Sequence, residues 1–263
     1  MSPPRATTAF IPHGGGPLPL LGDPQHAGLS AWLRGLLPRL RSRPRAVIVV
    51  SAHWEAPVPT LTSGAAPGLI YDYGGFPPAA YALTYPSPGH PELARRAHDL
   101  LVAAGLPASL DPQRGFDHGH FVPLSLIAPQ ADLPTLQLSL LAGLDPAAHY
   151  DLGVALRGLR DDDVLLLGSG MSFHNMQAFF NAGGGAEENA AFEAALREVI
   201  SLPDEAERRR RLVGWSDLPG ARFCHPRSEH LMPLLVCAGF AGAPAASVER
   251  INVLGRATTA CLW

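Results

Sequence analysis

The hydrophobic pattern of the chain predicts alternating strands and helices. Short, continuous apolar runs at 7–12, 47–50 and 164–167 are typical of strands that are buried on both faces of a largely parallel sheet. No internal repeat interrupts this order, so we expect one α/β domain over 1–263, with a central, largely parallel or mixed sheet flanked by helices. The expected helices cover 28–40, 91–104, 146–159, 187–200 and 204–212, and the other expected strands cover 58–62, 133–140, 251–254 and 257–262.

Three of the predicted strands lead into a histidine. His13 follows the first strand and precedes three glycines, His53 ends the run RAVIVVSAHW, and His174 follows the strand at 164–167. Ligands of open α/β sheets bind at the carboxyl ends of the strands, and neutral imidazole is the commonest metal-binding side chain. The pattern therefore predicts a metal site. One alternative for 13–17 is a flexible turn with an incidental histidine. A phosphate loop is a second alternative, but the segment lacks both GK[ST] and GxGxxG, and no compact signature such as HExxH identifies a metal.

Further histidines lie in segments that are rich in glycine or proline. His118 follows an aspartate between two glycines, so we expect a titratable imidazole on a loop with little side-chain cover. Ser228 is expected to cap a short helix whose first turn carries His230. Four other histidines, His26, His90, His98 and His149, are assigned to structural or surface positions.

Aromatic residues are concentrated in one turn-rich segment. Four of the five tyrosines fall between 71 and 85, together with Phe76 and several glycines and prolines. Loops of this composition make good pocket walls, which suggests an aromatic ligand and makes Tyr73 and Phe76 candidate substrate-binding residues. Ordinary packing of a surface loop is the alternative for each of them.

Composition narrows the possible partners and the compartment. With 47% hydrophobic residues, 16% charged residues and a net charge of −3, the chain is expected to be globular and not to bind nucleic acid. The basic run at 208–211 follows acidic residues and is expected to be a solvated helix face. Three cysteines without CxxC spacing, and the lack of a signal-like or membrane-spanning apolar stretch, predict a cytoplasmic protein without disulfides or a membrane partner. A homo-oligomer is compatible with the sequence, although no heptad or apolar stripe indicates an interface.

Six motifs taken in order resemble a known family. They are HGGGP at 13–17, SAHW at 51–54, YDYGGFP at 71–77, GFDHG at 115–119, GSGMSFHN at 168–175 and HPRSEHLMPLL at 225–235. The chain resembles the class III extradiol ring-cleaving dioxygenases of the LigB superfamily, in particular the DOPA-dioxygenase-like branch. The resemblance implies an α/β fold with a mononuclear non-haem Fe(II) site, at which some members carry zinc.

The resemblance also implies a ligand set. His13 and His53 match the two invariant ligand histidines of the family, and His230 matches the third ligand in the DOPA-dioxygenase-like branch. Protocatechuate-type members use a glutamate as the third ligand, so Glu229, which precedes His230, is an alternative third ligand.

Two more histidines acquire roles from the same comparison. His174 matches a histidine that lies over the metal, either as the catalytic base or as a fourth ligand, and both roles are kept. His118 matches a second active-site histidine, which is a candidate acid/base group or substrate clamp.

These roles predict a reaction. The expected activity is Fe(II)-dependent cleavage of a catechol, DOPA-like or related, with O2 to a ring-opened semialdehyde. The alternative is a zinc metalloprotein of the same fold with hydrolytic activity or none, because fold alone does not determine function.

Overall fold

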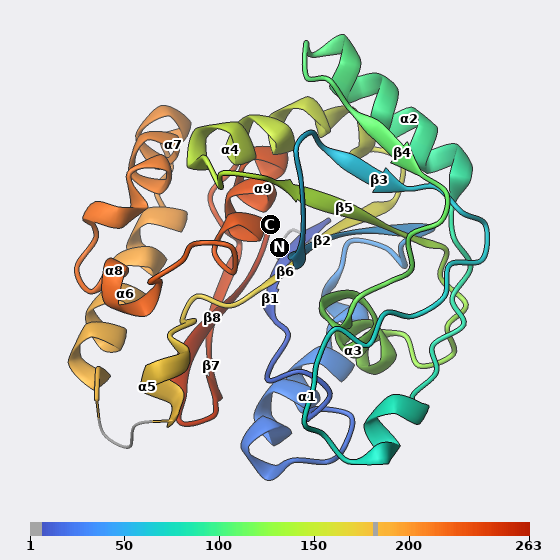
Figure 1. The fold of residues 1–263 in the computed structure, drawn as a ribbon. Coiled ribbons are helices and arrows are strands. Elements are labelled where there is room, and N and C mark those ends of the chain that lie inside the picture. Colours follow the sequence, from blue (N-terminus) through green and yellow to red (C-terminus); the bar gives the residue numbers. More distant parts are fainter. Residues whose placement is uncertain (1–6, 181–183) are drawn as a thin grey trace.

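Four parallel strands form the centre of an eight-stranded mixed sheet in the computed structural model, which describes residues 7–180 and 184–263 (Figure 1). The sheet order is β4-β3-β5-β2-β6-β1-β8-β7. The parallel strands are β1 (Thr8–Pro12), β2 (Ala46–Ala56), β5 (Thr135–Leu141) and β6 (Val164–Gly170). The outer strands are β3 (Thr60–Thr62), β4 (Ser109–Asp111), β7 (Ser247–Val253) and β8 (Arg256–Leu262). The mixed α/β fold expected from the sequence is confirmed.

Helices cover both faces of the sheet, and alternate residues of each central strand belong to opposite cores. Ile48 and Val50 pack into the core on one face, whereas Val47 and Val49 pack into the core on the other. Burial on both faces explains why the apolar run of β2 is continuous and does not alternate with polar residues. The first face carries α2 (Pro91–Ala103), α4 (Pro146–Ala155), α6 (Ala186–Ile200) and α9 (Met232–Ala241), and the second carries α1 (Ala27–Arg34) and α3 (His118–Ile127).

Three further α-helices are α5 (Met176–Phe180), α7 (Glu205–Val213) and α8 (Ala221–Cys224). Among the described residues, no helix combines the length and the apolar character needed to span a membrane.

The helix expected over 28–40 is shorter in the structure. α1 ends at Arg34, Gly35 follows as its C-cap, and a separate 3-10 turn covers Leu37–Arg39. Glycine is a poor interior helix residue, and Pro38 has no backbone N–H to continue the hydrogen-bond ladder. The expectation of one continuous helix was therefore wrong.

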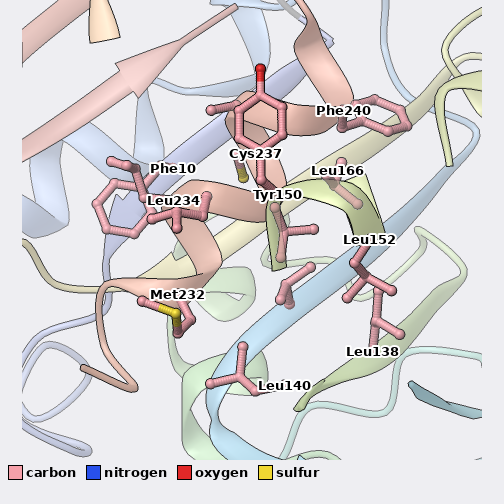
Figure 2. Packing of buried hydrophobic residues seen from close by; sticks show 14 of the residues in the cluster. Phe10, Leu138, Leu140, Tyr150, Leu152, Leu166, Met232, Leu234, Cys237 and Phe240 are labelled. Atoms are coloured by element: carbon pink, nitrogen blue, oxygen red, sulfur yellow. The ribbon is translucent and has the colours of Figure 1, made fainter. Parts of the chain in front are cut away.

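The helices α4 and α9 approach each other so closely that their contact requires glycine. A Cβ atom at Gly153 of α4 would lie 2.0 Å from the carbonyl oxygen of Val236, and one at Gly239 of α9 would lie 2.0 Å from that of Tyr150. Figure 2 shows the side chains that fill this layer, including Tyr150 and Leu152 from α4 and Leu234, Cys237 and Phe240 from α9. Because α9 begins two residues after His230, this packing also fixes the segment that carries that histidine.

We predict that Gly153→Ala destabilises the protein by about 1–3 kcal/mol, because the added methyl group forces the two helix backbones apart. The matched control is Gly28→Ala in α1, where an added Cβ meets no atom within 4 Å. That control should stabilise the fold by about 0.4–1 kcal/mol. Chemical denaturation of the two variants measures both effects, and equal unfolding free energies would contradict the prediction.

Candidate metal centre

Two histidines meet at the carboxyl ends of the central parallel strands. β6 lies between β1 and β2, so the carboxyl ends of all three strands share one edge of the sheet. His13 directly follows β1, and His53 lies in β2 where the pairing with β5 is interrupted between Val50 and Glu55. The two Nε2 atoms are 3.1 Å apart. The sequence pattern thus located both residues at the correct edge, although His53 lies inside its strand and not after it.

His230 reaches the same edge from the C-terminal half of the chain. Its backbone oxygen accepts a hydrogen bond from the Met171 N–H at 2.9 Å, and a Cβ atom at Gly170 would lie only 2.2 Å from that oxygen. A glycine at the end of β6 is therefore needed for the His230 segment to approach. The His230 ring centroid is 5.1 Å from that of His13 and 5.0 Å from that of His53.

A proline in a helix determines which nitrogen of His13 is free. Pro123 lies inside α3 and has no N–H, so the carbonyl of Gly119, four residues earlier, lacks its helical donor. The Ser169 hydroxyl donates to this carbonyl instead, and it lies 3.1 Å from Nδ1 of His13. Because the hydroxyl proton is used, Ser169 accepts the Nδ1–H of His13. The Nε2 atom of His13 then carries a lone pair.

The three histidines are suited to bind a metal ion. Burial holds the pKa of His13 and of His53 well below the ordinary value, and it lowers the pKa of His230 to about 4. Their imidazoles are therefore neutral, and their nearest ring nitrogens lie within 4.8 Å of one another. Two imidazole nitrogens that bind one ion at about 2.0–2.1 Å lie roughly 3 Å apart, in agreement with the His13–His53 separation. The donor set fits a first-row transition metal.

Glu229 lies behind this group and connects two histidines. One of its oxygens, Oε1, is 2.9 Å from Nδ1 of His230 and 3.2 Å from Nδ1 of His174, while Oε2 is 3.4 Å from the Arg227 guanidinium. Burial raises the pKa of Glu229, but the hydrogen bonds from the two histidines outweigh it and lower the pKa well below the ordinary value. The structure thus places Glu229 as an ionised partner of the histidines, on the Nδ1 side of His230.

His174 is stacked on His230 and is not grouped with the other two candidate ligands. The ring centroids of His174 and His230 are 3.4 Å apart, and the ring planes are inclined by 15°. The described potential ligand atoms form three groups: His13 with His53 and His230, His53 with Asp72 and His118, and His174 with Glu229 and His230. His174 thus shares a group with His230 but not with His13 or His53. This arrangement favours a role beside the metal over one as a ligand.

His118 is the first residue of α3 and is buried, so the expectation of a poorly covered loop was wrong. The apolar residues that follow it form a helix buried on all sides, and this helix brings the His118 ring to 3.9 Å from the ring of His53. Its Nδ1 atom lies 2.8 Å from Oδ1 of Asp72. Asp72 was not among the site residues predicted from the sequence, although its position between Tyr71 and Tyr73 of the aromatic segment was a usable signal.

Tyr73 and Phe76 form an aromatic wall beside the histidines. The Tyr73 ring is 5.8 Å from that of His118 and 5.5 Å from that of Phe76. Phe76 covers Gly16 of the glycine loop, because a Cβ atom at Gly16 would lie 3.3 Å from its ring. The Tyr73 hydroxyl donates to the Ala80 carbonyl, and burial raises the pKa of this phenol to about 12. Tyr73 therefore offers its ring, not an ionised oxygen, to a ligand.

The other histidines have structural partners. His26, for example, accepts a hydrogen bond from the Gly15 N–H and thereby fixes the loop after His13. The remaining partners are the Phe116 ring and Thr135 for His120, the Ser172 carbonyl for His225, Leu93 for His90, Asp99 for His98 and Leu141 for His149.

Comparison with known proteins decides which family this site belongs to. The family described as the catalytic LigB subunit of aromatic ring-opening dioxygenase matches residues 8–259. The chain belongs to this family. LigB-family dioxygenases are metal-dependent, in accord with the histidine group described above.

Relatives of the chain carry related names. The dioxygenase tasH of Hapsidospora irregularis is 45% identical over 253 residues, which cover 90% of this chain and 78% of the relative. The 4,5-DOPA dioxygenase extradiol of Beta vulgaris is 37% identical over 239 residues, covering 89% and 87%, and that of Escherichia coli is 35% identical over 242 residues, covering 91% and 86%. The crystal structure of an uncharacterized Escherichia coli K12 protein superimposes with a TM-score of 0.77 at 28% identity, covering 98% of this chain and 99% of that one. The LigB-family chain is thus an extradiol ring-opening dioxygenase, which acts on an aromatic substrate with O2.

We predict that His13→Ala and His53→Ala each abolish metal retention, because each removes one of three converging nitrogen donors. The matched control is His98→Ala on α2, where the histidine pairs with Asp99. Metal content is measured by elemental analysis after loading and dialysis against a weak chelator. Wild-type stoichiometry in both ligand variants would rule out this site.

Glu229→Gln is expected to weaken metal binding about 10- to 100-fold, because the ionised partner that orients His230 is lost. Competition with a chromogenic chelator measures the affinity. The control is Glu55→Gln, since Glu55 also pairs with Arg227 but has no hydrogen bond to a histidine of the site in the described part of the chain. Equal affinities of the two variants would contradict the role given to Glu229.

Proposed function

We propose that the protein is a non-haem Fe(II)-dependent extradiol dioxygenase that opens the ring of a catechol, DOPA-like or related, with O2. His13, His53 and His230 would hold the metal. The observation that supports this most directly is the convergence of three neutral imidazoles at one strand edge, with two further histidines beside them. A bound Fe(II) ion would supply the redox chemistry through which triplet O2 reacts with a closed-shell aromatic ring.

The two flanking histidines are suited to move protons. A catechol loses hydroxyl protons when it binds, and imidazole can accept and return a proton near neutral pH. In both His118 and His174 the Nδ1 atom faces a carboxylate, Asp72 and Glu229 respectively, so Nε2 is the nitrogen left to accept a proton. We assign His174 as the base, with a fourth-ligand role as its alternative, and His118 as an acid/base group or substrate clamp.

The reaction has a simple balance. Both atoms of O2 enter the product. The bond that breaks joins one hydroxyl-bearing carbon to the neighbouring ring carbon outside the diol. The hydroxyl-bearing end becomes a carboxylate, and the other end becomes an aldehyde. The chain would contribute the orientation of the ring, for which the wall formed by Tyr73 and Phe76 is suited. The names of the Beta vulgaris and Escherichia coli relatives support DOPA as a first substrate to test.

A second candidate function follows from the donor set itself. Three neutral imidazoles are also the ligands of some catalytic zinc sites, in which zinc activates water. A zinc protein with hydrolytic activity or none is therefore the competing proposal. The two proposals differ in their dependence on O2 and on the identity of the metal.

We expect protein reconstituted anaerobically with Fe(II) to consume O2 when DOPA or another catechol is added, and to form a yellow ring-fission product. An oxygen electrode and absorbance spectroscopy measure the two events on the same sample. The matched control is the same protein loaded with Zn(II), which lacks the redox chemistry and should consume none.

Two outcomes would contradict this assignment. Absence of O2 uptake across a broad panel of catechols would reject the dioxygenase. Hydrolytic activity that appears with Zn(II) and is indifferent to O2 would support the competing zinc protein. Metal analysis of protein purified without added metal accompanies both measurements.

A further inference from the structure

The N-terminus of α3 is capped by a residue from elsewhere in the chain. Asp117 occupies the N-cap position, but its side chain makes no capping hydrogen bond. Its carboxylate is buried and instead accepts hydrogen bonds from Ser51 at 2.7 Å and from Gln137. The backbone N–H of His118 donates to Oδ1 of Asp72 at 3.0 Å. Asp72 therefore accepts the N–H of the first helical residue, one of the donors that a helix N-terminus leaves without an intrahelical partner.

The same oxygen of Asp72 binds the His118 side chain. Oδ1 lies 2.8 Å from Nδ1 of His118, so one carboxylate oxygen receives both the backbone and the ring N–H of a single residue. These two bonds fix the ring rotation as well as the helix end. They also hold the proton of a neutral ring on Nδ1, because an ionised carboxylate accepts hydrogen bonds and cannot donate them.

The segment that carries Asp72 is positioned independently of His118. The Ile70 N–H donates to the Phe116 carbonyl and the Phe116 N–H to the Gly68 carbonyl, both at 2.8 Å. A Cβ atom at Gly115 would lie 2.6 Å from the Gly68 carbonyl oxygen, so the two backbones are in close contact. These contacts involve backbone atoms only. They position the segment that leads to Asp72 without any contribution from the His118 side chain.

Asp72 is not well placed to act on a metal ligand directly. Its second oxygen, Oδ2, is 3.7 Å from Nδ1 of His53, which is too long for a hydrogen bond. Its neighbours in sequence, Tyr71 and Tyr73, belong to the aromatic segment beside the site. The carboxylate therefore connects the aromatic wall to His118.

We propose that Asp72 is a positioning residue that holds His118 in the Nδ1–H form, with Nε2 free to accept a substrate proton, and that ties this group to the aromatic wall. The catalytic part of this assignment rests on the proposed function. The competing interpretation is that Asp72 serves only as the cap of α3. The two differ in whether removal of the carboxylate acts through the His118 ring.

The tautomer of His118 is measured by nitrogen-15 NMR of histidine-labelled protein, either metal-free or loaded with Zn(II), since both are diamagnetic. Spectra are recorded at about pH 8.5, above the ordinary histidine pKa of about 6.5. His118→Gln assigns the signal. We expect the Nδ1–H form in the wild type and appearance of the Nε2–H form in Asp72→Ala. Asp72→Asn should retain the Nδ1–H form, because its amide oxygen still accepts both bonds, and it also serves as the variant that keeps the fold.

Kinetics of the Fe(II) enzyme test whether Asp72 acts through His118. We expect Asp72→Ala to lower kcat about 10- to 100-fold with unchanged metal content, as is typical when a partner of an active-site group is lost. In the His118→Gln background the same change should lower kcat no further. The control is Asp111→Ala, because Asp111 accepts hydrogen bonds from the Gln113 and Arg114 N–H groups but from no histidine in the described residues. This control should leave both the tautomer and kcat unchanged.

The assignment is overturned if Asp72→Ala leaves the His118 tautomer unchanged, or if it slows the His118→Gln enzyme as much as it slows the wild type. Either result would indicate that Asp72 only caps the N-terminus of α3. A wild type that consumes no O2 with any catechol would reject the proposed function instead. The NMR result would still decide the position of the His118 proton in that case, so the two failures are distinguishable.

Discussion

The candidate site depends on one constraint, which is the orientation of several closely spaced imidazoles, most of them buried. A buried polar nitrogen without a partner is costly, and an imidazole has two nitrogens to satisfy. For His13, His118, His174 and His230, the partner lies on the Nδ1 side: Ser169 for His13, Asp72 for His118, and Glu229 for the last two. Each partner leaves Nε2 as the free nitrogen. The same constraint therefore makes some of these rings suitable as ligands and others as proton acceptors.

Several features of the fold interrupt regular helix or sheet structure but help to position these histidines. Pro123 interrupts the hydrogen bonds of α3, but the carbonyl that it leaves free orients Ser169 and hence His13. Gly170 adds no side chain to a central strand, but it admits the backbone of His230. The register of β2 against β5 shifts between Val50 and Glu55, and His53 lies in this irregular part of the strand. In each case a local loss of regular structure places a histidine.

The sequence predicted the sheet and the histidines far better than it predicted their partners. Continuous apolar runs are a local signal, and a histidine after such a run lies at a strand end whatever the rest of the chain does. This is why the strand ends that carry His13 and His53 could be located. Asp72 and Ser169 could not be predicted in the same way, because they lie 46 and 156 residues from the histidines that they bind. The helix at His118 was missed because its apolar face extends around the whole helix and gives no amphipathic period.

The residues around the three candidate ligands distinguish between possible reactions better than the ligands themselves do. Neutral imidazole binds iron, zinc, copper and nickel, so the donor set is compatible with several chemistries. Activation of water by zinc requires an open position and at most one base. Here His118 lies beside His53 and His174 lies beside His230, and each of the two flanking histidines is paired with a carboxylate. The aromatic wall lies next to His118. Two proton acceptors beside an aromatic wall match an aromatic substrate with two acidic hydroxyl groups, as in the proposed catechol.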